Sequence, residues 1–146
     1  MIFVDTNYFL RFLLNDNEAQ HQTAKQLFRD GAEGKIKLGT SIIVFFELYW
    51  VLKSFYEKEK TDIISILDGV LQMEFIELAE RPQLKHALAL FSDNAIELQD
   101  AFNIVFACSR PATDFKTFDK KLNKVFHEKT AYEGGLPLPA LKKLLN

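Results

Sequence analysis

Blocks of hydrophobic residues separated by polar ones predict strands and helices in turn along this chain. A β-branched and aromatic run at 2–4 predicts a strand, and residues 35–39, 74–78 and 112–117 are interpreted as three more. Helical spacing predicts helices at 8–14, 18–30, 42–57, from residue 61 onward, 82–91, 98–109, 119–125 and 140–145. Gly31 is the predicted stop of the second, Thr40 or Ser41 the predicted cap of the third, and Thr61 the predicted cap of the fourth. A turn is predicted at 134–137, before the last helix. Strands that alternate with helices predict an α/β fold, in which helices cover both faces of a parallel sheet.

Composition narrows the class of protein without naming a function. The 146 residues, 48% hydrophobic and 26% charged, predict a single globular domain over residues 1–146. The net charge of -2 excludes a chain-wide basic surface, so any nucleic-acid binding needs a local patch. A single cysteine excludes an intrachain disulfide and a Cys-rich zinc site. No secretory signal or membrane-spanning run is visible, so the expectation is a cytoplasmic protein without membrane contact.

Two acidic residues stand out by their position. Asp5 directly follows the first predicted strand, and open parallel sheets bind ligands beyond the carboxyl ends of their strands. The alternative role for Asp5 is a cap on the helix that follows. Glu47 interrupts an apolar helix that we expect to be buried, where an isolated charge is costly unless it is paired or binds a metal. The alternative for Glu47 is an ion pair with a Lys or Arg, or a place at the helix edge.

Two further acids extend the pattern. Asp100 begins one predicted helix and Asp119 follows the fourth predicted strand; each has helix capping as its alternative role. Carboxylates gathered in one place repel each other unless a cation neutralises them, and magnesium prefers such oxygen ligands. A cation held in this way can activate water and stabilise charge on a phosphate. The three histidines show no metal-ligand spacing and are interpreted as surface residues.

Four short motifs, in order, give the chain a resemblance to a known family. They read IFVDTN at residues 2–7, FEL at 46–48, LQDA at 98–101 and TFDKKL at 117–122. In order, spacing and total length the chain resembles the PIN domain, and especially the stand-alone VapC-type toxins of prokaryotic toxin–antitoxin pairs. The resemblance covers nearly the whole chain, and the ordered set is more specific than any one motif.

The resemblance implies a fold, an activity and a site. It implies a three-layer α/β/α sandwich with a mostly parallel central sheet of four or five strands, and cleavage of RNA that depends on Mg²⁺ or Mn²⁺. The implied catalytic and metal-binding residues are Asp5, Glu47, Asp100 and Asp119, and the implied supporting residues are Thr6, Asn7 and Thr117. The chain departs from the family where residues 112–116 are unusually polar. This makes Asp114 a rival to Asp119.

The same reading predicts partners. RNA binding requires cations that contact phosphate, and the segment 116–129 holds five lysines against two acids. The RNA-binding candidates are Arg11, Lys116, Lys120, Lys121 and Lys124, with an ordinary solvated lysine face as the alternative. The family implies a homodimer and an antitoxin protein that lies in an apolar groove. Candidates for that surface are Tyr49, Trp50, Phe55 and Tyr56, although core burial is expected for at least half of them.

Other functions were weighed against an RNA-cleaving toxin. A PIN nuclease of housekeeping RNA processing would use the same chemistry. A small antitoxin gene immediately upstream of the gene for this chain would favour the toxin. A dehalogenase-like phosphatase requires Asp-x-Asp after the first strand, where this chain has Asp5-Thr6-Asn7. A receiver domain requires an acid pair that is missing there. A non-catalytic binding module is disfavoured because all four acids are present.

Overall fold

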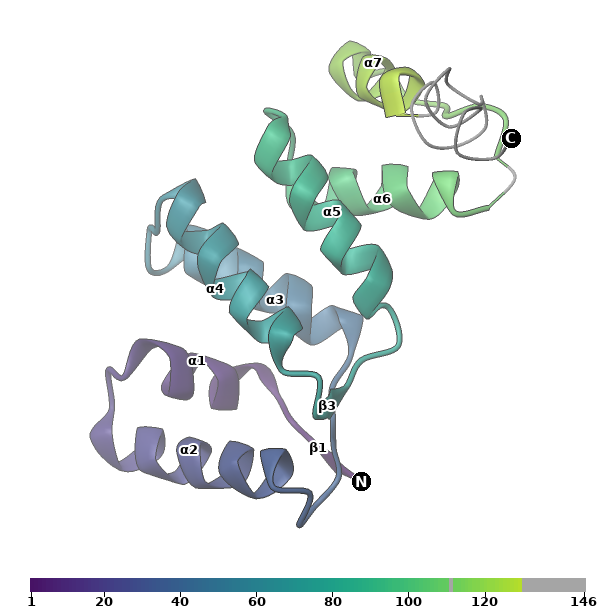
Figure 1. Cartoon of the computed structure of the whole chain (residues 1–146). Helices are drawn as coiled ribbons and strands as arrows, with labels where there is room; N and C mark the ends of the chain where they lie inside the picture. Colours follow the sequence, from purple (N-terminus) through teal and green to yellow (C-terminus); the bar gives the residue numbers. More distant parts are fainter. Residues whose placement is uncertain (111, 130–146) are drawn as a thin grey trace. The chain divides into compact units, whose positions relative to one another are not determined.

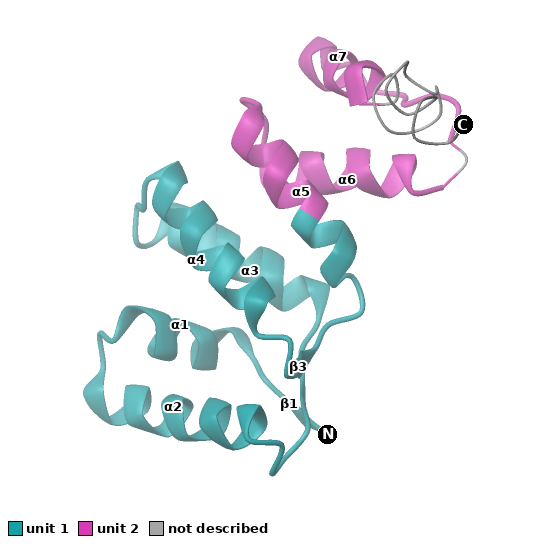
Figure 2. Ribbon diagram, in the orientation of Figure 1, with its two compact units in different colours: residues 1–85 teal, residues 86–146 magenta. Residues whose placement is uncertain are grey.

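The computed structural model describes residues 1–110 and 112–129. The chain divides into two compact units, residues 1–85 and residues 86–146, which Figure 2 colours separately. Helix α5, Arg81–Asp93, begins in the first unit and continues in the second. The single domain over 1–146 stays a prediction, and the expected turn at 134–137 and helix at 140–145 lie outside the described residues.

A small parallel sheet organises the first unit. Strands β1 (Ile2–Phe3), β2 (Leu38–Gly39) and β3 (Ile76–Glu77) lie in the order β1-β2-β3, so β2 is central. Two more backbone hydrogen bonds extend the pairing, from Val4 N–H to the Gly39 carbonyl (2.8 Å) and from Thr40 N–H to the Glu77 carbonyl (2.9 Å). The three strands therefore end together at one edge, where parallel sheets place their ligands.

Four helices complete the first unit: α1 (Thr6–Leu14), α2 (Glu18–Ala32), α3 (Ile42–Ser54) and α4 (Lys60–Gln72). Helix α1 packs on α2 and α3 packs on α4, as Figure 1 shows. Side-chain caps start two of them. Asn17 accepts from Gln20 N–H at 3.1 Å, and Ser41 accepts from Val44 N–H at 3.4 Å. The predicted cap of the third helix is thus Ser41.

Three predicted helix boundaries were wrong. Helix α2 continues through Gly31 to Ala32, and the left-handed residue after it is Gly34, with φ of 75°. Gly31 is needed for packing, because a Cβ there would lie 2.5 Å from the Leu38 side chain. Helix α4 begins at Lys60, so Thr61 lies within its first turn and caps nothing. Helix α3 ends at Ser54, short of the expected residue 57.

Aromatic side chains fill the core of the first unit. Phe9 of α1 and Phe28 of α2 are buried, with ring centroids 5.4 Å apart. Phe45 and Tyr49 of α3 are buried as well. Burial places Tyr49 inside the protein rather than on the predicted antitoxin surface.

Arg81 joins the end of α4 to β3. Its guanidinium donates to the backbone carbonyls of Leu71 and Ile76, and to that of Met73 at 3.2 Å. These carbonyls belong to the end of a helix and to the strand after it, so a single cation satisfies acceptors that the helix end leaves unpaired. Partial burial lowers the pKa of Arg81, although a guanidinium stays charged at neutral pH.

The second unit contains α6 (Leu98–Cys108) and α7 (Lys120–Lys129) as well as the later part of α5. The buried face of α6 consists of Leu98, Ala101, Ile104 and Val105. Leu122, Val125 and Phe126 of α7 are also buried. Both helices were expected from the spacing of their apolar residues. Among the described residues, no helix is both long enough and apolar enough to cross a bilayer.

The predicted fourth strand is absent from the described part of the chain. Residues 112–117 have no regular secondary structure, and the sheet has three strands instead of the expected four or five. The reason is local: the Asp114 carboxylate accepts from Phe115 N–H at 2.8 Å and pairs with Lys116 at 2.5 Å. A side chain that binds a neighbouring backbone N–H competes with strand pairing. The α/β class with a parallel sheet is confirmed.

Candidate functional site

Asp5 lies at the carboxyl edge of the sheet, where the chain leaves β1 for α1. The backbone just before it is held on β2, because the Thr40 hydroxyl donates to the Val4 carbonyl at 2.8 Å. Asp5 occupies the N-cap position of α1, but its carboxylate accepts no capping hydrogen bond. The capping alternative is therefore wrong for this residue. Its exposed carboxylate stays available to a ligand.

Thr6, the next residue, holds a buried polar atom without a partner. Its side chain is 2% exposed, and its hydroxyl oxygen makes no hydrogen bond with any of the described residues. A buried hydroxyl usually has a partner, because losing water without compensation costs free energy. Its place beside Asp5 suits the predicted supporting role, in which it would bond to a carboxylate or to a ligand's water. Asn7 is exposed one residue further on.

Glu47 lies on the exposed side of α3, so the prediction that it is buried was wrong. It shares that side with Ile43 and Trp50, both exposed. Burial was inferred because α3 is apolar nearly all round, but the buried side holds Val44, Phe45, Leu48, Tyr49 and Leu52. The cost of an isolated buried charge therefore gives no argument for Glu47. Its place in the site rests on the motif alone.

Asp100 and Asp119 lie close enough in the second unit to influence each other. Partial burial, followed by the charges of Asp119 and Glu97, raises the pKa of Asp100 above its ordinary 3.8. The contribution of the neighbouring acids is the effect expected of carboxylates that lie close together. Glu97 was not among the predicted site residues, although its spacing of three residues from Asp100 places both at the start of α6.

Asp119 is oriented by the helix that it caps. Its Oδ1 accepts from the backbone N–H groups of Lys121 (2.9 Å) and Leu122 (3.2 Å). The Thr117 hydroxyl accepts from Asp119 N–H at 3.0 Å, so Thr117 positions the backbone of this acid. The capping alternative is confirmed for Asp119, but it uses Oδ1 only. The cap fixes the carboxylate while its other oxygen is left for a ligand.

Asp114, the rival of Asp119, is engaged elsewhere. The hydrogen bond from Lys116 is the main cause that lowers its pKa, with the Phe115 N–H second. Asp114 does not appear among the groups that raise the pKa of Asp100, whereas Asp119 does. The carboxylate beside Asp100 is therefore that of Asp119.

The lysines predicted to bind RNA differ in the contacts that they already make within the protein. Lys120, Lys121 and Lys124 lie on the exposed side of α7, next to Asp119. Lys121 donates to the Ala95 carbonyl at 3.3 Å, and Lys124 lies 3.9 Å from Glu128, which at such exposed positions is a weak ion pair. Lys116 is largely neutralised by Asp114.

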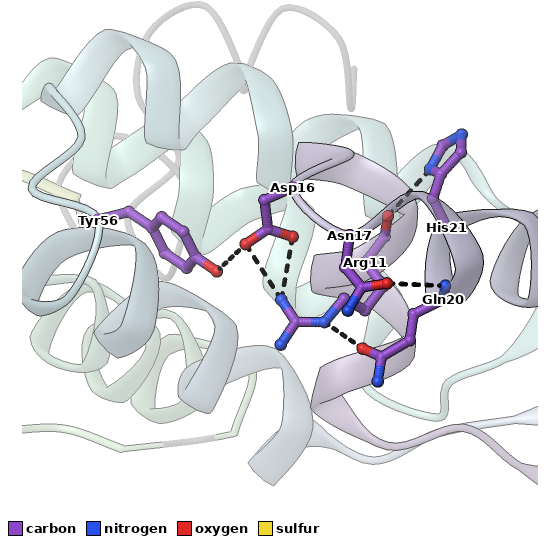
Figure 3. Close-up of polar contacts among 6 residues, drawn as sticks. All are labelled: Arg11, Asp16, Asn17, Gln20, His21 and Tyr56. Atoms are coloured by element: carbon purple, nitrogen blue, oxygen red, sulfur yellow. Dashed lines mark hydrogen bonds and ion pairs between the residues drawn. The ribbon is translucent and has the colours of Figure 1, made fainter.

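Arg11 belongs to a polar network at the far end of α1, drawn in Figure 3. Its Nη1 donates to both oxygens of Asp16, at 3.0 and 3.1 Å, and its Nε donates to Gln20 Oε1 at 2.5 Å. The Tyr56 hydroxyl donates to Asp16 at 2.8 Å. This network, which the sequence analysis did not predict, orients the guanidinium and offsets its charge.

The predicted metal ligands belong to different units of the chain. The first unit carries Asp5 and Glu47, and the second carries Asp100 and Asp119. Neither unit by itself, within its described residues, gathers three or more Asp, Glu, His or Cys side chains at metal-binding distance. The chemistry of these residues fits a hard divalent cation, which prefers oxygen ligands. They offer carboxylate oxygens, of which the Asp5 carboxylate is not used in a helix cap, and the unpartnered Thr6 hydroxyl lies beside it.

Comparison with known proteins assigns the chain to a family. The sequence profile of the PIN domain matches residues 2–127. The chain is 25% identical over 125 residues to a VapC ribonuclease of Aquifex aeolicus, a match that covers 86% of this chain and 92% of that protein. No solved structure matches the chain. With the profile extending from β1 to α7, the chain belongs to the PIN domain family.

Proposed function

We propose that this protein is a divalent-metal-dependent endoribonuclease, and that it is the toxin of a type II toxin–antitoxin pair. Its substrate is RNA, and the reaction is hydrolysis of a phosphodiester bond by water. The similarity to a VapC ribonuclease supports the toxin assignment. The acids that act in this proposal are Asp5, Glu47, Asp100 and Asp119.

The observation that carries the proposal is the raised pKa of Asp100 next to Asp119. Carboxylates held close enough to repel each other cost stability, which a protein tolerates where a cation uses them. Burial is the larger cause of the shift, and it strengthens the argument, because a partly desolvated carboxylate attracts a cation more strongly than one in water.

Each residue of the site has a role in the proposed reaction. Asp5, Glu47, Asp100 and Asp119 hold Mg²⁺ or Mn²⁺, and Thr6 orients the Asp5 carboxylate or a water beside it. Thr117 keeps Asp119 in place through its backbone. The chemistry that the ion supplies when bound is activation of water and stabilisation of the negative charge on the phosphate. The exposed lysines of α7 attract the RNA backbone.

The partners proposed are an antitoxin and a second copy of the chain. Trp50 and Phe55, 49% and 77% exposed, are the members of the predicted apolar surface that are free to contact a partner. Tyr56 is half-buried and donates to Asp16, so it contributes less. The three-layer sandwich that the family implies stays part of the proposal.

Cleavage of RNA by the purified protein tests this proposal. We expect fragments from a long RNA in Mg²⁺ or Mn²⁺ and none in excess chelator. Asp5→Asn removes a ligand charge and should abolish cleavage, whereas Asp62→Asn, the same change at an exposed position of α4, should leave it intact. Cleavage that survives chelation, or that is equal in Asp5→Asn and the wild type, would refute it.

A further inference from the structure

Phe118 is the most exposed large hydrophobic residue in the part of the chain that the structure describes. Its exposure is 108% of the reference value, so the rest of the described protein covers no part of its ring. It lies between Thr117 and Asp119, directly before α7. A single exposed apolar side chain is ordinary on a protein surface. The role of Phe118 therefore depends on what surrounds it.

The aromatic packing next to α7 is made by a different residue. The ring of Phe115 stacks on that of Phe126, with 5.2 Å between the centroids, and Phe126 is 1% exposed. Phe118 comes three residues later and takes no part in this contact, although the apolar face of α7 is buried. The packing of the described residues thus gives no reason for an aromatic ring at position 118.

The backbone around Phe118 is held in place although the ring is exposed. The Thr117 hydroxyl accepts from Asp119 N–H at 3.0 Å, a hydrogen bond that spans Phe118. Asp119 in turn accepts from Lys121 N–H at 2.9 Å and so fixes this segment to the start of α7. A side chain on a backbone that is already ordered loses less entropy when a ligand binds it.

The start of α7 has a charge pattern that favours an anionic ligand. Lys120 and Lys121 lie in its first turn, residues 120–123 hold no acid, and Lys124 follows; all three lysines are exposed. Cations at the N-terminus of a helix oppose the helix dipole, whose positive end is there. An anion bound at this end would offset both the lysine charges and the dipole, and phosphate is the anion that such helix ends commonly bind.

An exposed aromatic ring beside exposed cations matches the chemistry of a single-stranded nucleic acid. In such complexes the bases stack on aromatic side chains while cations follow the phosphate backbone. Asp119, the acid next to Phe118, keeps one carboxylate oxygen outside its cap for a ligand. Consecutive Cα atoms lie about 3.8 Å apart, so ring and carboxylate are within reach of neighbouring groups of one RNA strand.

We propose that Phe118 stacks on a base of single-stranded RNA next to the phosphate at Asp119; this rests on the proposed nuclease function. The lysines of α7 contact the phosphates of the same strand. Stacking tolerates every base, because every base has a π-face. Phe118 therefore holds the strand in place without selecting its sequence.

Binding of labelled hexauridylate and hexaadenylate to the full-length protein, in excess chelator at low salt, tests the stack apart from cleavage. We expect Phe118→Ala to weaken the binding of both about tenfold, within the range for one base–aromatic stack, while Tm holds because the ring is exposed. Phe106→Ala is the matched control on α6. Arg110 already lies over that ring at 3.5 Å, so both affinities should stay unchanged.

Several outcomes of this experiment would overturn the proposal. Wild-type affinity in Phe118→Ala would show that no base stacks there, as would a wild type that binds neither oligonucleotide. A lower Tm with wild-type affinity would show that the ring packs within the protein. Failure of the wild type to cleave RNA in Mg²⁺ would instead refute the nuclease function, while the affinities decide the stack.

Two further substitutions separate stacking from a general apolar contact. Phe118→Trp keeps an aromatic face and should keep the affinity for both oligonucleotides. Phe118→Leu keeps an apolar side chain but has no π-face, so it should bind as weakly as Phe118→Ala. Wild-type affinity in Phe118→Leu would overturn the stack.

The salt dependence of binding tests the lysines of α7. Lys120→Gln should reduce the slope of log affinity against log salt by about 0.7, the change for one phosphate contact of a single strand. Phe118→Ala should leave the slope unchanged because the ring carries no charge. Lys25→Gln makes the same substitution at an exposed position of α2 and should also leave it unchanged. A wild-type slope in Lys120→Gln would overturn the contact between this lysine and phosphate.

Discussion

Replacing Thr6 by valine should stabilise the metal-free protein while it weakens metal-dependent activity. The two side chains have nearly the same shape and are both β-branched, so packing and backbone preference change little. What changes is the hydroxyl, which is buried to 2% exposure and has no partner among the described residues. The substitution removes a polar group whose burial is uncompensated until a ligand is present.

The size of the effect follows from the cost of burying such a group. An unpaired hydroxyl costs about 1–3 kcal/mol in proteins, and we expect Thr6→Val to raise the free energy of unfolding by about 1–2 kcal/mol. For a chain of this length, that corresponds to a rise of roughly 3–7 °C in Tm. Metal affinity should fall by about 10–100-fold, as is usual when a residue that orients a ligand is lost.

Thermal and urea unfolding in chelator measure the first effect, and calorimetric titration with Mn²⁺ measures the second. Thr40→Val is the matched control of opposite sign. Its hydroxyl donates to the Val4 carbonyl at 2.8 Å, so the same substitution should cost about 1–2 kcal/mol. A Thr6→Val protein that is less stable than the wild type without metal would refute the reasoning, because the hydroxyl would then have a partner in the folded protein.

Three other changes test separate parts of the structure. A raised pKa means that ionised Asp100 destabilises the fold, so metal-free Asp100→Asn should be more stable than the wild type at neutral pH. Urea unfolding should show this gain in stability vanish as the pH falls below the ordinary pKa of 3.8. A gain that grows toward acid pH would contradict the direction of the pKa shift. Arg81→Met leaves three backbone carbonyls without their cation and should cost about 2–4 kcal/mol in the same assay; a cost under about 1 kcal/mol would show that water replaces it. Gly34→Ala should cost about 1 kcal/mol through its φ of 75°, and Gly31→Ala at least as much through its contact with Leu38, both read from Tm; a neutral Gly31→Ala would mean that Leu38 moves aside freely.

Much of the fold was predictable because local chemistry and packing agree. Strand-like runs and helical spacing located the three strands and the seven helices of the described residues, although some helix boundaries were wrong. Cap chemistry located the start of α3 at Ser41, where the side chain satisfies a free backbone N–H. Glycine was ambiguous: Gly31 serves close packing and Gly34 serves a left-handed turn, and the sequence does not distinguish the two needs.

The misread elements share a cause, which is that their surroundings decide their state. Residues 112–117 were predicted to form a strand despite their polar character, but Asp114 binds its own neighbours and takes the backbone out of pairing. Helix α3 is apolar on nearly every side, so its sequence periodicity does not show which side faces the core. Glu47 was therefore placed inside although it is exposed.

The candidate acids were found from position and motif, and the structure distinguishes their local roles. Asp5 and Asp119 looked alike as capping residues, yet only Asp119 caps. Asp100 and Asp119 are nineteen residues apart in sequence, and their mutual influence depends on how α6 and the start of α7 pack. No local pattern predicts such a contact, and none predicted the Arg11–Asp16–Tyr56 network either.

The central proposal, that Asp5, Glu47, Asp100 and Asp119 bind a divalent ion, is tested most directly by the Mn²⁺ affinity of Asp5→Asn and Asp100→Asn beside the wild type. The account predicts one class of binding site in the wild type and at least a tenfold loss of affinity in each variant. Wild-type affinity in either variant would contradict it, because the substituted carboxylate would then take no part in binding the metal.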